Sequence, residues 1–350
     1  MDTRTLSIVA DSNIPFLTSA LSSAGNLTSL TASEITPEVI ADTDALIIRT
    51  RTRCDESTLS GSRCRFIGTA TIGTDHIDIP WCEAQGITVA NAPGCNAPAV
   101  AQWVLAAIRD TLPAGRPFEG LTLGVIGAGN VGSILIRWAR SLGLRVLVND
   151  PPLQLSQPDR YVYSTLADIA AEADVITVHT PLTHNGPHPT SHLIDSEFVD
   201  SLRRAPLVIN AARGPVTDTE ALLDGLRCGK ISAVAIDCWE GEPAINLELL
   251  ELATIATPHI AGYSIEGKTR ASQMVLDALG DFLETHTALA TANETKRLKA
   301  DAPALHPIPD AITAARIGYP SILSDTATLK ASPSSFETLR NTYHLRPEPA

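Results

Sequence analysis

"LTLGVIGAGNVGSILIRWA" spans residues 121–139 and joins an apolar strand to an apolar helix through a glycine-rich turn. Gly127 permits the tight turn, and Gly129 lets the backbone approach a pyrophosphate. Gly132 allows the helix to pack close to the sheet, and the N-terminus of that helix offers N–H donors and a positive dipole to phosphates. The stretch therefore predicts a strand–turn–helix unit that binds a dinucleotide.

The strand after this unit indicates which dinucleotide is bound. It is predicted over "LRVLVND" and ends in Asp150, which lies 150 − 132 = 18 residues past the last glycine. A carboxylate there accepts both ribose hydroxyls of NAD and repels the 2′-phosphate of NADP, and no arginine stands beside it. We therefore predict NAD, held by Asp150 and by a glycine loop that includes Asn130 and Val131. A glycine-rich turn followed by a chance aspartate is the competing interpretation.

Short apolar stretches alternate with helical ones on both sides of this unit. A second series of strands and helices extends to about residue 258, and strands are predicted on the N-terminal side at 5–11, 44–50, 64–70 and 86–93. This alternation is typical of parallel sheets covered on both faces, so the predicted class is α/β with doubly wound parallel sheets. A long helix from Ala99 is expected to bridge the two series. The tail from about 286 is rich in Ala, Thr, Pro and Ser, and only 336–345 is predicted to be helical.

The composition narrows the class of function. The chain has 350 residues, enough for two or three domains, and its net charge of −13 argues against non-specific binding to nucleic acid or to an anionic membrane. Its six cysteines form no CxxC pair and no zinc-like cluster with histidine, so we expect reduced thiols and no metal site. We find no signal-peptide pattern and no apolar stretch long enough to span a bilayer, which predicts a cytoplasmic protein.

Three polar residues follow predicted strands of the second series. Arg213 comes after "LVINAA", Glu242 after "AVAIDCWEG" and His259 after "ATIATP". Ligands of doubly wound sheets sit outside the carboxyl ends of the strands. Arg213 can hold a carboxylate in a bidentate fork, His259 can accept a hydroxyl proton, and Glu242 can orient the imidazole. The set predicts oxidation of a 2-hydroxy acid, although each residue alone would also suit an ion pair or a polar loop.

Several longer stretches are similar to a known family. "GTATIGTDHIDIPWCEAQGI", "NAPGCNA", "WEGEP" and "HIAGYSIEGK" resemble the D-isomer-specific 2-hydroxyacid dehydrogenases, and the resemblance covers residues from about 5 to 285. The last three are typical of a branch that acts on a phosphorylated sugar acid. The family implies a cytoplasmic homodimer in three parts: a flavodoxin-like substrate domain at 1–94 and 262–285, a Rossmann NAD domain at 95–261, and a shortened C-terminal α+β dimerisation region at 286–350.

The resemblance also implies roles residue by residue. Arg213 and Glu242 would be active-site residues, and His259 would be the acid/base. Three residues would touch the substrate: Thr50, Thr71 and Tyr263. Besides the glycine loop, six residues would lie on NAD: Asp150, Thr180, Ala211, Ala212, Asp237 and Gly262. No metal is implied.

Some alternatives stay open at this point. The alternating residues Arg49, Arg51 and Arg53 would either bind the substrate phosphate or form a solvated face. The family usually carries Glu where this chain has Gln102, and the tail is short, which bears on the mode of dimerisation more than on the chemistry. Another acid such as 3-phosphoglycerate would suit the same residues. So would an NAD-sensing binding protein, since such relatives keep an Arg/Glu/His set.

Overall fold

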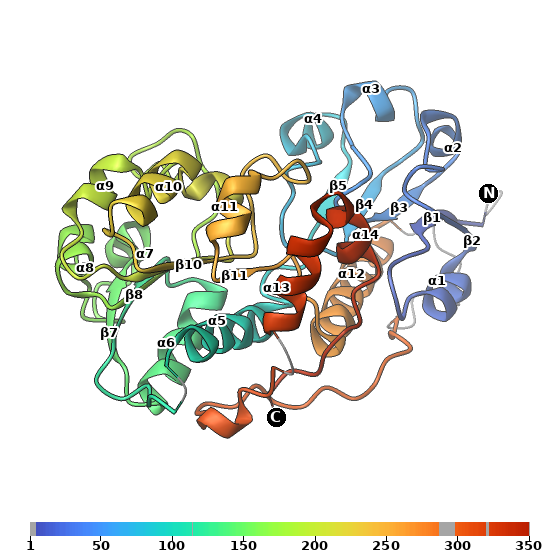
Figure 1. Cartoon of the computed structure of the whole chain (residues 1–350). Helices are drawn as coiled ribbons and strands as arrows, with labels where there is room; N and C mark the ends of the chain where they lie inside the picture. Colours follow the sequence, from blue (N-terminus) through green and yellow to red (C-terminus); the bar gives the residue numbers. More distant parts are fainter. Residues whose placement is uncertain (1–4, 114, 287–297, 320–321, 350) are drawn as a thin grey trace. The chain divides into compact units, whose positions relative to one another are not determined.

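A computed structural model describes residues 5–113, 115–286, 298–319 and 322–349 (Figure 1). Two compact units make up the chain. The first unit consists of Met1–Asn96 and Ile265–His306, and the second of Ala97–Ser264 and Pro307–Ala350. The limits predicted at 94/95 and 261/262 fall close to these divisions, whereas the tail that the sequence sets apart from 286 onward divides between the units. The roles predicted for the two units stay predictions.

The first unit contains a five-stranded sheet in which all neighbouring strands pair in parallel. Its order is β2-β1-β3-β4-β5, with the bounds β1 Ser7–Asp11, β2 Asn26–Leu30, β3 Ala45–Ile48, β4 Phe66–Thr69 and β5 Thr88–Ala90. The four strands predicted on the N-terminal side are confirmed. We did not predict β2, because this polar strand lies at the edge of the sheet with no buried residue and so lacks an apolar pattern.

Helices cover both faces of this sheet, as the α/β class requires. One face packs against α1 (Thr18–Ala24) and α12 (Ile265–Thr285), with Leu21 and Val275 in the shared core. The other face packs against three short helices: α2 Pro37–Ala41, α3 Glu56–Leu59 and α4 Ile79–Ala84. The segment from Ile265, which lies between the two parts of the second unit, therefore completes the core of the first unit. The first unit is thus assembled from two distant parts of the chain.

The second unit contains a six-stranded parallel sheet in the order β11-β10-β9-β8-β6-β7. The bounds are β6 Thr122–Ile126, β7 Arg145–Asn149, β8 Val175–Val178, β9 Leu207–Asn210, β10 Ala233–Ile236 and β11 Ile255–Ala256. Strand β7 lies on one side of β6 and β8 lies on the other, so the winding reverses at β6. Such a switch point leaves a crevice at the carboxyl ends of the strands, where doubly wound folds bind their ligands.

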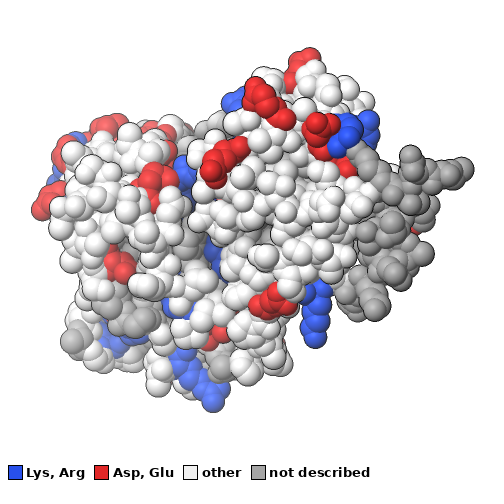
Figure 2. Space-filling view, turned by 90° about the vertical axis from the view of Figure 1, so that its right-hand side faces the viewer, with Lys and Arg blue, Asp and Glu red and all other residues white. Residues whose placement is uncertain are grey.

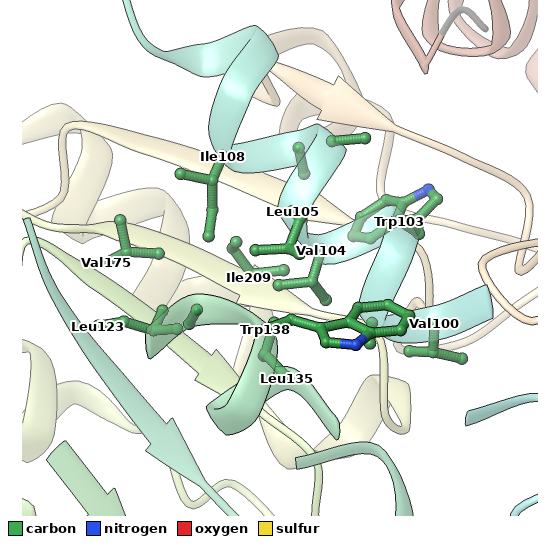
Figure 3. Packing of buried hydrophobic residues seen from close by; sticks show 14 of the residues in the cluster. Val100, Trp103, Val104, Leu105, Ile108, Leu123, Leu135, Trp138, Val175 and Ile209 are labelled. Carbon is green, nitrogen blue, oxygen red and sulfur yellow. The ribbon is translucent and has the colours of Figure 1, made fainter. Parts of the chain in front are cut away.

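Two apolar cores fill the faces of this second sheet. One lies under α5 (Ala97–Thr111) and α6 (Asn130–Ser141), where Trp103 and Trp138 pack near Ile209 of β9 (Figure 3). The other lies under α8 Leu166–Glu172, α9 Ser196–Ser201, α10 Thr219–Arg227 and α11 Leu247–Leu252. The helix predicted from Ala99 is α5. It is buried on every side as far as Ile108, and not only along one stripe.

The described part of the tail in the second unit packs onto β11 and its surroundings. It contains α13 (Ile322–Ala331) and α14 (Phe336–Asn341), and it brings Leu329 and Phe336 into the second core. The Ala256 N–H of β11 donates a 3.0 Å hydrogen bond to Thr326 Oγ1. This bond satisfies a strand-edge group that would otherwise be open to other chains. The helix predicted at 336–345 is present and ends at Asn341.

The remaining elements are short, and they include α7 Pro151–Ser156 and the 3-10 turns η1 Gly214–Val216, η2 Ala314–Arg316 and η3 Pro333–Ser335. Among the described residues, none of the helices is long and apolar enough to cross a bilayer. On the face shown in Figure 2, Lys and Arg side chains are scattered among Asp and Glu and form no continuous basic patch.

Candidate active site

The glycine loop between β6 and α6 has the shape that a bound pyrophosphate requires. Gly127 has a φ of +93°, and a Cβ atom there would lie 2.8 Å from the carbonyl carbon of His179. A Cβ at Gly132 would lie 2.0 Å from the carbonyl oxygen of Gly127. A Cβ at Gly129 would meet nothing within 4 Å. The fold itself needs glycine at Gly127 and Gly132, whereas Gly129 leaves open space in which a ligand can reach the backbone.

Asp150 is held against this loop from the end of β7. Its Oδ2 accepts a 2.8 Å hydrogen bond from the Ala128 N–H, and its Oδ1 accepts a 2.9 Å bond from the Leu153 N–H at the start of α7. Each carboxylate oxygen can accept a further bond. The side chain is therefore fixed beside the glycine loop and keeps acceptor capacity for hydroxyl groups.

The end of β8 approaches the same loop and carries two buried polar atoms without a partner. Among the described residues, neither Thr180 Oγ1 nor His179 Nδ1 has a hydrogen bond. A buried polar group of this kind is costly unless a ligand or a water completes it. Together with the open space at Gly129, the unpaired hydroxyl of Thr180 fits a dinucleotide in the crevice.

His259 and Glu242 form a close pair at the carboxyl ends of β11 and β10. His259 Nδ1 lies 2.6 Å from Glu242 Oε1, and each side chain is 25% exposed. Burial opposes ionisation of Glu242, but the hydrogen bond and the charge of His259, with that of Arg340, outweigh it and lower the pKa of Glu242. The other oxygen, Oε2, accepts a 3.3 Å bond from the Trp239 N–H. The pairing at Nδ1 leaves Nε2 as the ring nitrogen that can take a proton.

The backbone of His259 adopts an unusual conformation that a buried carboxylate supports. Its φ of +57° lies in the left-handed region, which non-glycine residues rarely occupy. Asp237 accepts a 2.6 Å bond from Thr257 Oγ1, a 2.7 Å bond from the Ile260 N–H and a 3.0 Å bond from the Ala261 N–H. The Asp237 side chain is therefore enclosed beneath the loop, and burial raises its pKa. Its expected contact with NAD stays a prediction.

Arg213 reaches the same region from the end of β9. Asn210 shapes this turn, since its Nδ2 donates to the carbonyls of Arg213 at 3.0 Å and Gly214 at 3.2 Å. A Cβ at Gly214 would lie 2.0 Å from the carbonyl oxygen of Trp239, so the loop after β9 packs directly on the loop that leads to Glu242. Strands β9, β10 and β11 are neighbours. The structure therefore gathers the loops of Arg213, Glu242 and His259 at one edge of the sheet.

The other residues predicted for the second unit lie in these loops. Ala211 and Ala212 immediately follow β9, and Gly262 follows the His259 loop. Tyr263 is half-buried, and its N–H donates a 2.9 Å bond to the carbonyl of Ile260. Asn130 and Val131 begin α6. All of them lie on loops or helix ends that follow sheet strands, and their contacts with NAD or substrate stay predictions.

The first unit carries Thr50 and Thr71, the two predicted substrate contacts that precede the second unit in the chain. Thr50 lines a cavity of about 770 Å³ together with Arg51 and Arg53. Thr71 Oγ1 lies 2.7 Å from Thr69 Oγ1 and donates to the carbonyl of Gly73 at 3.1 Å.

Arg49 and Arg53 are each paired with a carboxylate. Arg49 Nε pairs with Asp11 Oδ2 at 2.8 Å, and Arg53 pairs with Asp55. Arg49 therefore supports the fold, and Arg51 and Arg53 are the arginines that face the cavity.

Two arginines of the tail were not predicted as part of this region. Arg346 is 3% exposed and donates to the carbonyls of Ala99 at 3.0 Å, Ile260 at 3.2 Å and Tyr263 at 2.9 Å, and also to that of Ala261. Arg340 lies 3.8 Å from Glu242. Their only signal in the sequence was a pair of arginines in and after the predicted C-terminal helix. Among the described residues, no group of His, Cys, Asp or Glu is arranged to hold a metal ion.

Comparison with known proteins gives consistent matches. A sequence profile described as "D-isomer specific 2-hydroxyacid dehydrogenase, NAD binding domain" matches residues 97–261. The chain is 41% identical to an erythronate-4-phosphate dehydrogenase of Bacteroides fragilis, over 98% of this chain and 97% of the relative. It is 38% identical to one of Salmonella arizonae, over 98% of this chain and 92% of the relative.

Solved structures show the same architecture. A D-lactate dehydrogenase from Aquifex aeolicus, complexed with NAD and lactic acid, is 27% identical with a TM-score of 0.69, over 81% of this chain and 97% of that chain. An NAD⁺-bound 3-phosphoglycerate dehydrogenase of Entamoeba histolytica is 25% identical with a TM-score of 0.68, over 83% of this chain and 99% of that chain.

Proposed function

We propose a function for this chain from the premise that it belongs to the erythronate-4-phosphate dehydrogenase branch of the D-isomer-specific 2-hydroxyacid dehydrogenases. It is an NAD-dependent oxidoreductase that acts on a CH–OH group. It oxidises 4-phospho-D-erythronate to 2-oxo-3-hydroxy-4-phosphobutanoate in the biosynthesis of pyridoxal 5′-phosphate. The names of the curated relatives support the substrate. The observation that carries the chemistry is the 2.6 Å contact between His259 Nδ1 and Glu242 Oε1, in the same unit as the glycine loop.

The reaction removes a hydride from C2 of the acid and a proton from the hydroxyl on that carbon, which becomes a carbonyl. His259 accepts the proton at Nε2, because Nδ1 faces Glu242. Glu242 fixes the tautomer of the ring and stabilises the imidazolium that forms. Arg213 holds the substrate carboxylate in a bidentate fork, which orients C2. NAD, when bound, supplies the nicotinamide carbon that receives the hydride.

The second unit is proposed to hold NAD at the switch point of its sheet. The glycine loop and the start of α6 take the pyrophosphate, and Asp150 accepts the ribose hydroxyls. The buried hydroxyl of Thr180, which has no partner among the described residues, forms a hydrogen bond with the cofactor. The full proposed set is Gly127, Gly129, Asn130, Val131, Gly132, Asp150, Thr180, Ala211, Ala212, Asp237 and Gly262, in which Asp237 acts through the backbone that it holds.

For the substrate we propose contacts from Thr50, Thr71 and Tyr263. The phosphate needs cationic donors, and the cavity beside Thr50 offers Arg51 and Arg53. Arg49 is excluded from this role because it does not line the cavity and its mostly buried guanidinium pairs with the buried Asp11, whereas Arg53 is exposed and lines the cavity. We also propose that the chain works in the cytoplasm as a homodimer. Light scattering during size-exclusion chromatography would test the dimer.

The first experiment is single-turnover formation of NADH from 4-phosphoerythronate, with 3-phosphoglycerate as the comparison substrate. We compare the wild type with His259→Ala and with the control His188→Ala, which removes an exposed histidine of the same unit. We expect a burst of NADH with 4-phosphoerythronate in the wild type and the control, and none in His259→Ala. NADH binding, followed by fluorescence, should be similar in all three proteins.

Each other result has a definite meaning. Turnover of 3-phosphoglycerate alone would keep the mechanism and reject the substrate. Turnover of neither acid by a protein that binds NADH would favour an NAD-sensing binding protein. A full burst in His259→Ala would reject His259 as the proton acceptor.

A further inference from the structure

Helix α14 of the tail places the guanidinium of Arg340 beside the His259–Glu242 pair. Its Nη1 lies 3.8 Å from Glu242 Oε1, which is the oxygen that also contacts His259 Nδ1 at 2.6 Å. The side chain of Arg340 is only 14% exposed. One carboxylate oxygen therefore faces two groups, the imidazole of His259 from the loop after β11 and the guanidinium of Arg340 from the tail.

Arg340 also contacts the residue that is predicted to touch the substrate. Its side chain is hydrogen-bonded to that of Tyr263. The ring of Tyr263 in turn meets Tyr343, just beyond α14, edge-on with centroids 6.2 Å apart. The Arg340 guanidinium thus contacts both Glu242, which pairs with His259, and Tyr263, which is predicted to touch the substrate. Glu242 lies on the loop after β10, and Tyr263 lies on the loop after β11.

The tail is held to the second unit on both sides of Arg340. Arg346 donates to the carbonyls of Ile260 and Tyr263, on either side of the loop that follows His259. Phe336, at the start of α14, is fully buried in the second core. The tail is therefore anchored at the start of α14 and again at Arg346, and the Arg340 side chain between these points is mostly buried. A cation that is buried to this extent is costly unless it has partners, and its partners here are site residues.

We propose that Arg340 is a positioning residue for the oxidation. It holds Glu242 and Tyr263 in one arrangement, and its positive charge partly compensates the negative charge of Glu242 beside His259. This inference rests on the proposed function. It adds a residue that acts through Glu242 and not on the substrate itself.

The physical reason lies in what the oxidation requires of His259. The ring must be neutral before it can accept a proton, whereas an unshared carboxylate beside it would favour the charged ring. A second cation near the same oxygen reduces that preference and repels the imidazolium. Other charged or titratable groups around the pair are Arg213 after β9, Asp237 and Cys238 after β10, and Tyr263 after β11. Arg340, unlike these groups, comes from the tail.

The test compares Arg340→Gln with Arg340→Lys and with the control Arg137→Gln, which removes an exposed arginine that pairs with Asp310. The pH dependence of kcat/KM is measured for oxidation of 4-phosphoerythronate. In Arg340→Gln we expect the acid limb to move upward by roughly one pH unit, with a raised KM. In Arg340→Lys the acid limb should return toward the wild type, while KM stays raised because an ammonium cannot replace the fork. The control should match the wild type.

A second measurement does not depend on turnover. The ring of His259 is titrated by ¹³C NMR in the wild type and in Arg340→Gln, and its signal is assigned by its loss in His259→Ala. The titration midpoint should be higher in Arg340→Gln, while NADH affinity stays within about twofold. If Arg340→Gln does not fold, the Lys variant decides: a wild-type acid limb with a raised KM supports the proposal, and a wild-type KM overturns it.

The outcomes separate this inference from the proposed function. A wild type that does not oxidise 4-phosphoerythronate contradicts the substrate, and the NMR titration then still tests Arg340. A folded Arg340→Gln with an unchanged titration, acid limb and KM overturns the role of Arg340 and leaves the proposed function in place.

Discussion

The glycine loop of the second unit can adopt its shape because its glycines have no side chains. The loop that carries His259 is instead held in shape by charged side chains that are buried around it. At Gly132 a methyl group would collide with the carbonyl oxygen of Gly127 at 2.0 Å. Around His259, Asp237 accepts two backbone N–H groups and Arg346 donates to backbone carbonyls. The first loop is a local device, while the second depends on residues from other strands and from the tail.

The largest expected effect comes from removing the support of the second loop. Arg346→Met leaves several buried carbonyls and the side-chain oxygen of Gln102 without their donor. We expect a loss of about 3 kcal/mol or more in the free energy of unfolding, measured with urea at pH 7. Turnover should fall at least tenfold. NADH affinity of the folded fraction should fall less than turnover, because the glycine loop has no part in this contact and, of the proposed cofactor residues, only those around the His259 loop, such as Gly262, depend on it.

The control for this experiment is Arg316→Met, which removes an exposed arginine of the tail. It should leave both stability and turnover close to the wild type. Wild-type turnover in Arg346→Met would mean that the His259 loop holds its shape without the tail, and the contrast between the two loops would disappear.

A matched pair of glycine variants sharpens the same comparison. Gly132→Ala forces a backbone shift, so we expect a loss of about 1–3 kcal/mol in the free energy of unfolding together with weaker NADH binding. Gly129→Ala meets nothing in the chain itself, so its stability should stay within about 0.5 kcal/mol of the wild type. Its NADH affinity should nevertheless fall, because the methyl group occupies the space of the pyrophosphate. Equal effects on stability in the two variants would contradict this division of roles.

A smaller effect is expected at the end of β8. Thr180→Val removes a hydroxyl that has no partner in the described chain, so stability should not decrease. NADH affinity should fall by roughly tenfold if the cofactor supplies that partner. The matched control is Thr177→Val, where the lost hydroxyl contacts His179 Nε2 at 2.9 Å. The control should lower stability by about 1 kcal/mol and leave NADH affinity unchanged. An unaltered affinity in Thr180→Val would remove Thr180 from the proposed cofactor contacts.

The local loop could be predicted from the sequence because all its requirements lie within one short stretch. The spacing of the glycines, the strand before them and Asp150 after them together indicate the unit, and the structure shows the geometry that this spacing requires. The order of Arg213, Glu242 and His259 after three successive strands could also be predicted. In a parallel sheet, the carboxyl ends of neighbouring strands lie at one edge.

The support of the second loop could not be predicted because its members are far apart in the chain. Arg346 and Gln102 are separated by 244 positions, and no periodic pattern links them. The position of Asp237 was predicted, but not the use of its side chain, which is 1% exposed beneath the loop. In the first unit, β2 was missed for a different reason, since an edge strand with exposed side chains carries no apolar signal.

Gln102 allows the smallest and most specific test, because its side chain contacts both Arg346 and the backbone of the tail. In this chain Gln102 Oε1 accepts a 3.1 Å bond from Arg346 Nε, and Gln102 Nε2 donates to the carbonyls of Ile317 at 2.9 Å and Pro347 at 3.3 Å. Gln102→Glu would gain an ion pair with Arg346 but would lose both donated bonds. We therefore expect a change of less than about 1 kcal/mol in the free energy of unfolding at pH 7.

The pH dependence of this variant tells the two contributions apart. A carboxylate paired with Arg346 should have a folded-state pKa below its unfolded value of about 4.3, so its stabilising effect is present above that value and is lost as the pH falls through the folded pKa. Urea unfolding of the variant and the wild type at pH 7 and pH 4 isolates this effect, because the other titrating groups are common to both. The free energy of unfolding of the variant, relative to that of the wild type, should be lower at pH 4 than at pH 7. A difference that does not depend on pH would mean that residue 102 holds the tail through neutral hydrogen bonds alone.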